Sequence, residues 1–137
     1  MSWKTFEHPA DVGLLVEAAD GPALFADAAL ALFDLVCDLE QVEERERYEL
    51  AAEAASIEEL LVGWLNDLVY LFEGEGVVCR RVCFRSWAET AYVAELFGEP
   101  VDPSRHDPHD LVKAATYHGL AVERGAYGWR ARVILDV

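Results

Sequence analysis

Apolar and polar residues recur with two different periods along this chain, and these periods predict helices and strands. In residues 20–38 and 56–76, apolar side chains return every three or four positions, which is the spacing of a helix with one apolar face. Asp20 and Ser56 are the first residues of these segments, and both are typical N-cap residues. We therefore expect two amphipathic helices. The aspartates expected to face water in the first helix are Asp27, Asp34 and Asp38.

Elsewhere the pattern favours strands separated by Gly, Pro and charged residues. The segments expected to be strands are 2–6, 14–19, 47–53, 77–87, 90–98, 112–123 and 129–137. A Pro- and Asp-rich loop is expected at 98–110. This order predicts an α+β fold in which two amphipathic helices pack on a mostly antiparallel β-sheet, as a single domain over residues 1–137.

Composition narrows the class of protein. The chain has 137 residues and a formal net charge of −15, which would repel a phosphate backbone, so direct nucleic-acid binding is not expected. The surplus acids suit a cationic protein partner or serve solubility. No apolar run approaches the roughly 18 residues of a membrane span, and the start lacks the pattern of a signal peptide. We expect a cytoplasmic protein with no membrane association.

Three cysteines, Cys37, Cys79 and Cys83, match no disulfide framework. Cys79 and Cys83 lie about 13 Å apart if residues 77–87 form a strand, which is too far to share a zinc ion. Buried structural cysteines are the favoured interpretation.

Carboxylates offer the clearest candidate site. Asp11 follows Pro9 in a predicted turn, and Asp136 is next to the terminal carboxylate of Val137. If the last strand runs beside the first strand pair, three anionic groups converge, and a hard divalent cation would neutralise them. The alternative is a set of independent solvated acids.

Two further clusters have weaker signals. His106, Asp107, His109 and Asp110 could hold a transition metal, but the spacing matches no zinc pattern, and such residues are common in loops.

The stretch "LVKAATYHGLAVE" brings polar side chains into an apolar run. Strand alternation would place Lys113 and Tyr117 on one face and His118 on the other. On that face, a hydrogen-bonded core histidine is a simpler interpretation of His118 than a general base.

Four segments in this order resemble the archease family across essentially the whole chain: "FEHPADVG", "LFADAALALF", "GEPVDPSRHDPHDLVKAATYHGLAVE" and "WRARVILDV". The resemblance implies a non-catalytic activator of an RtcB-type RNA-splicing ligase, which promotes guanylylation of the ligase and its multiple turnover. In the family, the acid of the first motif and the acid of the C-terminal ending hold a divalent metal with help from the final residue.

Carried onto this sequence, the resemblance implies that Asp11, Asp136 and Val137 bind a divalent ion. Calcium is the expected ion, with magnesium or manganese as alternatives. The residues it assigns to the ligase partner are Lys113, His118, Tyr117 and His8. Pro9 stands where the family more often has Thr, which removes a hydroxyl and an amide donor from the turn.

Two other functions stay open. A general chaperone or assembly factor would expose apolar surface and bind many clients. A metal-dependent hydrolase built on the same acids would need a positioned base and an open metal position.

Overall fold

The structure is a computed structural model that describes residues 2–8, 11–109, 112–126 and 128–137, and of residues 7 and 8 it describes the backbone only. The predicted turn residue Pro9 and the loop residue Asp110 lie outside this description. The elements are β1 (Ser2–His8), β2 (Asp11–Ala18), α1 (Gly21–Val36), a 3-10 turn (Leu39–Gln41), β3 (Glu46–Glu53), α2 (Ile57–Glu73), β4 (Val77–Ala88), β5 (Ala91–Pro100), α3 (Pro103–His106), β6 (Ala114–Ala115), β7 (Ala121–Gly125) and β8 (Gly128–Asp136).

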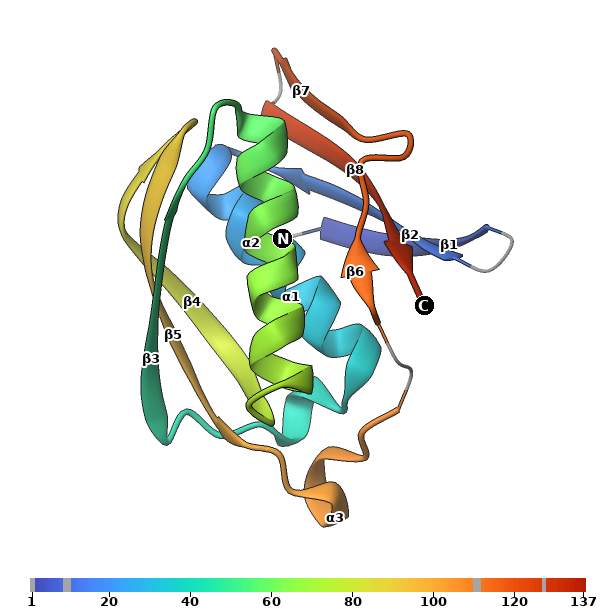
Figure 1. Ribbon diagram of the computed structural model, residues 1–137, viewed down its shortest axis with the longest axis vertical. Coiled ribbons are helices and arrows are strands. Elements are labelled where there is room, and N and C mark those ends of the chain that lie inside the picture. The colour runs from blue at the N-terminus through green and yellow to red at the C-terminus, as the bar shows by residue number, and fades with distance from the viewer. Residues whose placement is uncertain (1, 9–10, 110–111, 127) are drawn as a thin grey trace.

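The strands form two antiparallel sheets with the long helices between them (Figure 1). One sheet has the order β1-β2-β8-β6, with β7 also paired to β8, and the other has the order β3-β5-β4. The predicted α+β class, the two long helices and the antiparallel pairing are confirmed. The division into two sheets and the short helix α3 were not predicted, because the sequence pattern does not say which strands are neighbours.

Both long helices begin as predicted. The Asp20 carboxylate accepts a hydrogen bond from the Ala23 amide at 2.9 Å, and the Ser56 hydroxyl accepts one from the Glu59 amide at 3.2 Å. These bonds satisfy amide groups that a helix N-terminus leaves without intrahelical partners.

One predicted exposure in α1 is wrong. Asp27 is only 2 % exposed, and burial raises the pKa of its carboxyl. The reason is that α1 lies between two sheets and is covered on more than one side, whereas the prediction assumed a single buried face. Asp34 and Asp38 are exposed, as expected.

The core between the sheets is rich in aromatic rings. Phe25 of α1 meets Tyr92 and Trp87 edge to face, and Trp64 of α2 meets Tyr92 in the same way. The indole N–H of Trp64 donates to the Phe25 carbonyl oxygen at 2.9 Å, so a buried polar group is satisfied while the two helices are tied together.

The two cysteines of β4 point to opposite faces. Cys79 is buried, as expected, but Cys83 is exposed, so that part of the prediction is wrong. The register of β4 against β5 shifts between Cys79 and Arg81, and one extra residue in a strand reverses the alternation that follows it.

The predicted strand 112–123 is interrupted. Only Ala114 and Ala115 pair with β8 before the chain turns, and pairing resumes at Ala121 in β7. Gly119 has a φ of +62°, a value that suits glycine, and the Leu120 amide bonds the Tyr117 carbonyl. The expected alternation of Lys113 and Tyr117 on one strand face is therefore wrong.

None of the helices in the described ranges combines the length and the apolar character needed to cross a membrane.

Candidate functional site

A row of residues crosses the five-stranded sheet where β8 ends. His8 of β1 pairs with Asp11 of β2, Asp11 pairs with Asp136 of β8, and Asp136 pairs with Ala114 of β6. We call these four positions the acidic row. The last strand therefore pairs with the strand that follows the first turn, as predicted. His8 occupies the next position of the same row.

The two aspartates of this row face away from the helices. Leu135 is fully buried on the helix side, and successive residues of a strand point to opposite faces. Because residues paired across an antiparallel ladder point to the same face, Asp11 and Asp136 place their carboxylates side by side, with Cα atoms about 4.5 to 5.5 Å apart in such pairs.

Like charges at directly paired positions repel, and a hard divalent cation would relieve that repulsion. The donors fit calcium, magnesium or manganese, which bind carboxylate oxygen, better than zinc, which favours sulfur and imidazole nitrogen. In the described part of the chain, no group of three or more His, Cys, Asp or Glu side chains could hold a metal ion. The remaining ligand of the predicted set is the terminal carboxylate of Val137, which is not a side-chain group.

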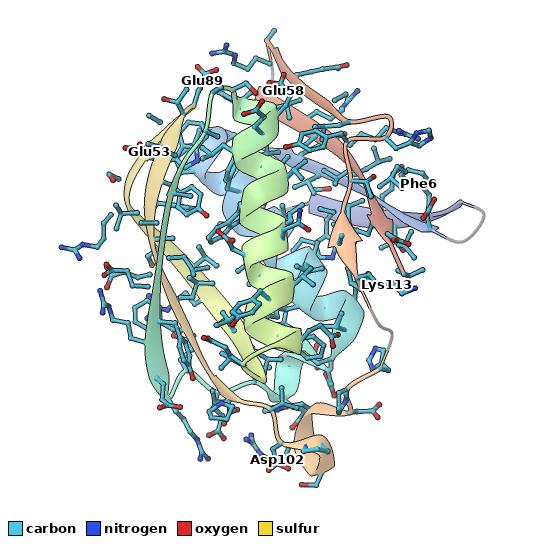
Figure 2. The ribbon with its side chains drawn as sticks, in the orientation of Figure 1. Phe6, Glu53, Glu58, Glu89, Asp102 and Lys113 are labelled. Atoms are coloured by element: carbon cyan, nitrogen blue, oxygen red, sulfur yellow. The ribbon has the colours of Figure 1, made fainter. Side chains whose placement is uncertain are left out.

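Lys113 lies directly beside the acidic row. Its amide donates to the carbonyl oxygen of Asp136 at 2.8 Å, and its side chain is exposed next to the end of β8 (Figure 2). Asn66 of α2 fixes this segment from the other side, since its amide side chain accepts from the Ala115 N–H at 2.7 Å and donates to the Ala115 carbonyl at 3.3 Å.

Tyr117 and His118 belong to the turn that follows β6, and both side chains are exposed. The His118 amide donates to the Thr116 hydroxyl at 3.3 Å, and that hydroxyl donates to the Ile134 carbonyl at 2.9 Å. The interpretation of His118 as a core histidine is wrong, because the strand has ended before it and the turn projects outward.

Arginine and aromatic contacts hold this turn on the sheet. Arg132 of β8 donates to the Gly119 carbonyl at 2.8 Å, and its guanidinium lies over the Phe6 ring, 5.1 Å from the centroid. The ring in turn covers Gly13, where a Cβ atom would collide with it. Neither Arg132 nor Asn66 was predicted from the sequence. A signal was present for Asn66, because asparagine is a weak helix former inside a strongly helical pattern.

A second polar cluster lies near the C-terminal end of α1, around Glu99 at the end of β5. Its carboxylate is 3 % exposed and accepts hydrogen bonds from Arg105 at 2.7 Å and from the Glu43 amide at 2.7 Å. The His106 ring nitrogen Nε2 lies 2.9 Å from it. Burial alone would raise the pKa of Glu99, but the Arg105, Glu43 and His106 bonds outweigh it and lower the pKa to about 2.

The His-Asp loop does not form the candidate metal cluster among its described residues. His106 is fully buried, and its Nδ1 accepts from the Asp102 amide at 2.8 Å while Nε2 faces Glu99, so both nitrogens are occupied. His109 is exposed and contacts the Asp107 carbonyl. The simpler interpretation, that these residues shape a loop, is confirmed for His106.

Comparisons with known proteins cover the whole chain. The model of the Archease protein family matches residues 3–137. Protein archease of Methanopyrus kandleri is 37 % identical over 142 residues, which is 100 % of both chains. The solution structure of protein 1598 of Methanobacterium thermoautotrophicum matches with a TM-score of 0.74 at 26 % identity, over 98 % of both chains.

A structure from Thermotoga maritima, described as an archease and possible chaperone, has the same fold, with a TM-score of 0.64 at 19 % identity over 98 % of this chain and 96 % of that one.

Proposed function

The chain belongs to the archease family, and we propose on that basis that it activates an RtcB-type RNA-splicing ligase, promoting guanylylation of the ligase and its multiple turnover. It would act as a non-catalytic accessory protein. The observation that carries the proposal is the strand register that pairs Asp11 with Asp136. The Lys113 amide is hydrogen-bonded to the carbonyl oxygen of Asp136.

In this proposal Asp11 and Asp136, with the terminal carboxylate of Val137, hold a divalent ion, calcium in the first place. Such an ion supplies positive charge that stabilises phosphate oxygens when it is bound. The exposed Lys113 amine offers a second positive charge beside the row. Tyr117 and His118, exposed on the adjoining turn, together with His8 from the row itself, would contact the ligase.

The charge of the chain suits a protein partner. With a net charge of −15, the activator is repelled by RNA and attracted by a basic surface, and opposite fields raise the rate of encounter. Contact with the RNA substrate would therefore be left to the ligase.

A general chaperone is the main rival function, as the description of the Thermotoga maritima structure suggests for that protein. Broad client binding needs a continuous apolar surface. Across the described ranges, the large hydrophobic side chains that are exposed are Tyr70, Tyr117 and Val137. Three side chains are too few to form such a surface, which favours a specific partner.

The test is single-turnover guanylylation of an RtcB-type ligase with GTP and divalent metal, with and without this protein. We expect the wild-type chain to stimulate guanylylation and Asp136→Ala to abolish the stimulation while keeping its fold by circular dichroism. Asp34→Ala, which removes an exposed acid from α1, is the matched control and should stimulate fully.

Absence of stimulation by the wild-type chain with its cognate ligase would exclude this function and leave the chaperone as the leading one. GTP hydrolysis by the isolated chain would instead point to the metal-dependent hydrolase.

A further inference from the structure

A shallow groove of about 630 Å³ runs along α2 beside the acidic row. One wall is the C-terminal half of the helix, and the other is the segment that leads into β6. The residues that line it are Asn66, Val69, Tyr70, Glu73, Gly74, Val112, Lys113 and Ala114. Most of the lining is apolar, so the groove can take the aliphatic part of a side chain.

The helix wall is one continuous face, because Asn66 lies three and four residues before Val69 and Tyr70, and Glu73 lies four and three residues after them. The two hydrogen bonds between the Asn66 side chain and the Ala115 backbone fix the opposite wall at a constant distance from this face. The groove is therefore formed before any partner arrives, which lowers the entropic cost of binding.

Tyr70 forms an aromatic platform at the groove. It is 65 % exposed, the highest value among the large hydrophobic side chains that the structure describes. One edge of its ring lies on Gly74, where a Cβ atom would come within 2.9 Å of the ring. The glycine lets the ring lie back on the helix end, and the rest of the ring stays open to solvent.

The charge around this platform is negative. The last turn of α2 contains no basic residue, although the C-terminus of a helix carries partial negative charge and favours cations. Glu73 lies in that turn, and Glu75 follows it, both exposed. Among the described residues that line the groove, Lys113 is the one with a cationic side chain.

We propose that this groove binds an arginine side chain of the partner ligase. The guanidinium would stack on the Tyr70 ring, near Glu73 and the C-terminus of α2, while its methylene groups lie along the opposite wall at the partly exposed Ala114. An arginine suits the site better than an acidic or purely apolar side chain, because it combines a flat cation with an aliphatic stem.

The groove and the acidic row meet at the β6 edge of the sheet, with the groove on the helix side and the two carboxylates on the outer face. Lys113 belongs to the groove wall and donates its amide to Asp136, so a ligase surface seated on the row would extend over the groove. The inference rests on the proposed function for the identity of the partner, but it concerns affinity rather than activation.

The experiment measures the Kd of the complex between this protein and the RtcB-type ligase by biolayer interferometry with calcium present. The rate of ligase guanylylation is measured alongside, at a saturating concentration of this protein. We expect Tyr70→Ala to raise the Kd about tenfold and Tyr70→Phe, which keeps the ring, to change it less than about twofold. Guanylylation at saturation should be unchanged. Unchanged thermal unfolding of each variant confirms its fold.

Glu73→Gln tests the charge of the occupant. We expect it to raise the Kd about threefold at low ionic strength and to reduce the dependence of Kd on salt. Glu53→Gln is the matched control, since Glu53 is exposed on β3, away from Lys113 (Figure 2), and should leave the Kd unchanged.

The outcomes separate this inference from the proposed function. If the ligase binds and is stimulated, but Tyr70→Ala binds as tightly as the wild type, the groove is not a docking site and the proposed function stands. If Tyr70→Ala weakens binding while Glu73→Gln changes neither Kd nor salt dependence, the occupant is apolar and the arginine is excluded. If the ligase binds without being stimulated, the proposed function fails, and the Tyr70 comparison still decides the groove.

Discussion

At the end of β5 the carboxylate of Glu99 is surrounded by donors of the chain itself, whereas at the end of β8 the carboxylate of Asp136 lies beside a second carboxylate, that of Asp11. The first arrangement is buried and surrounds one negative charge with Arg105, His106 and the Glu43 amide. The second brings two like charges together on an outer face. A charge that is compensated within the chain serves the fold, and a pair that repels is suited to an ion from outside.

The contrast predicts, first, that Glu99 is the more important acid for stability. Glu99→Gln places an amide group among the donors of Arg105, His106 and the Glu43 backbone, and a buried donor without an acceptor is costly. We expect a loss of about 3 kcal/mol in the free energy of unfolding, measured by urea titration at pH 7.

Glu95→Gln is the control, because Glu95 lies on the same strand and forms an ion pair with Arg47 on the outer face. Its effect should be much smaller. Equal losses in the two variants would show that burial of Glu99 adds nothing, and the contrast between the two regions would fail.

A second prediction concerns the loss of stability at low pH. The folded-state pKa of Glu99 is lowered from 4.5 to about 2, so its contribution to stability is fully present above pH 4.5 and is lost as the pH falls toward 2. The shift corresponds to about 3 kcal/mol at most. The stability difference between wild type and Glu99→Gln, measured by urea titration, should therefore shrink steadily from pH 5 to pH 2 by about that amount.

Taking the difference removes the opposite contribution of acids such as Asp27, whose pKa is raised by burial. A difference that stays constant over this range would mean that the Glu99 carboxylate is not the source of the stability.

These two regions differed in how far the sequence could reveal them. The pairing of Asp11 with Asp136 was within reach, because it requires only that the last strand runs beside the first hairpin. The Glu99 cluster was not, since its partner Glu43 is 56 residues away and only the fold brings them together. No local pattern marks an acid that will be buried.

Irregular backbone limited the prediction elsewhere. The elements with strong periodicity, α1 and α2, were placed correctly together with their caps. The break after Ala115 depends on a side-chain bond from Thr116 to the Ile134 carbonyl and on the φ of Gly119, and the exposure of Cys83 depends on one extra residue in β4. Each is a single-residue departure that alternation cannot anticipate.

The third prediction concerns stabilisation of the chain by a metal ion bound at the acidic row. Calcium at about ten times its Kd should stabilise the wild-type chain by about 1.4 kcal/mol, which raises the melting temperature by a few degrees. Asp136→Asn should abolish this shift, and Asp34→Asn, at an exposed position of α1, should keep it. The measurement is thermal unfolding by circular dichroism with calcium and then with excess EDTA. An equal calcium shift in Asp136→Asn would place the ion elsewhere.

The smallest expected effect is the most direct test of repulsion within the acidic row. Without metal and at low ionic strength, Asp136→Asn removes one of two like charges paired across the ladder, and we expect it to stabilise the chain by about 0.5 kcal/mol. In an Asp11→Asn background the same change should bring little or no gain, because the repulsion between the two carboxylates is already gone. A double-mutant cycle by urea titration measures this coupling. If Asp136→Asn destabilises the chain instead, then its carboxylate is held by donors of the protein as Glu99 is, and the two regions no longer differ in kind.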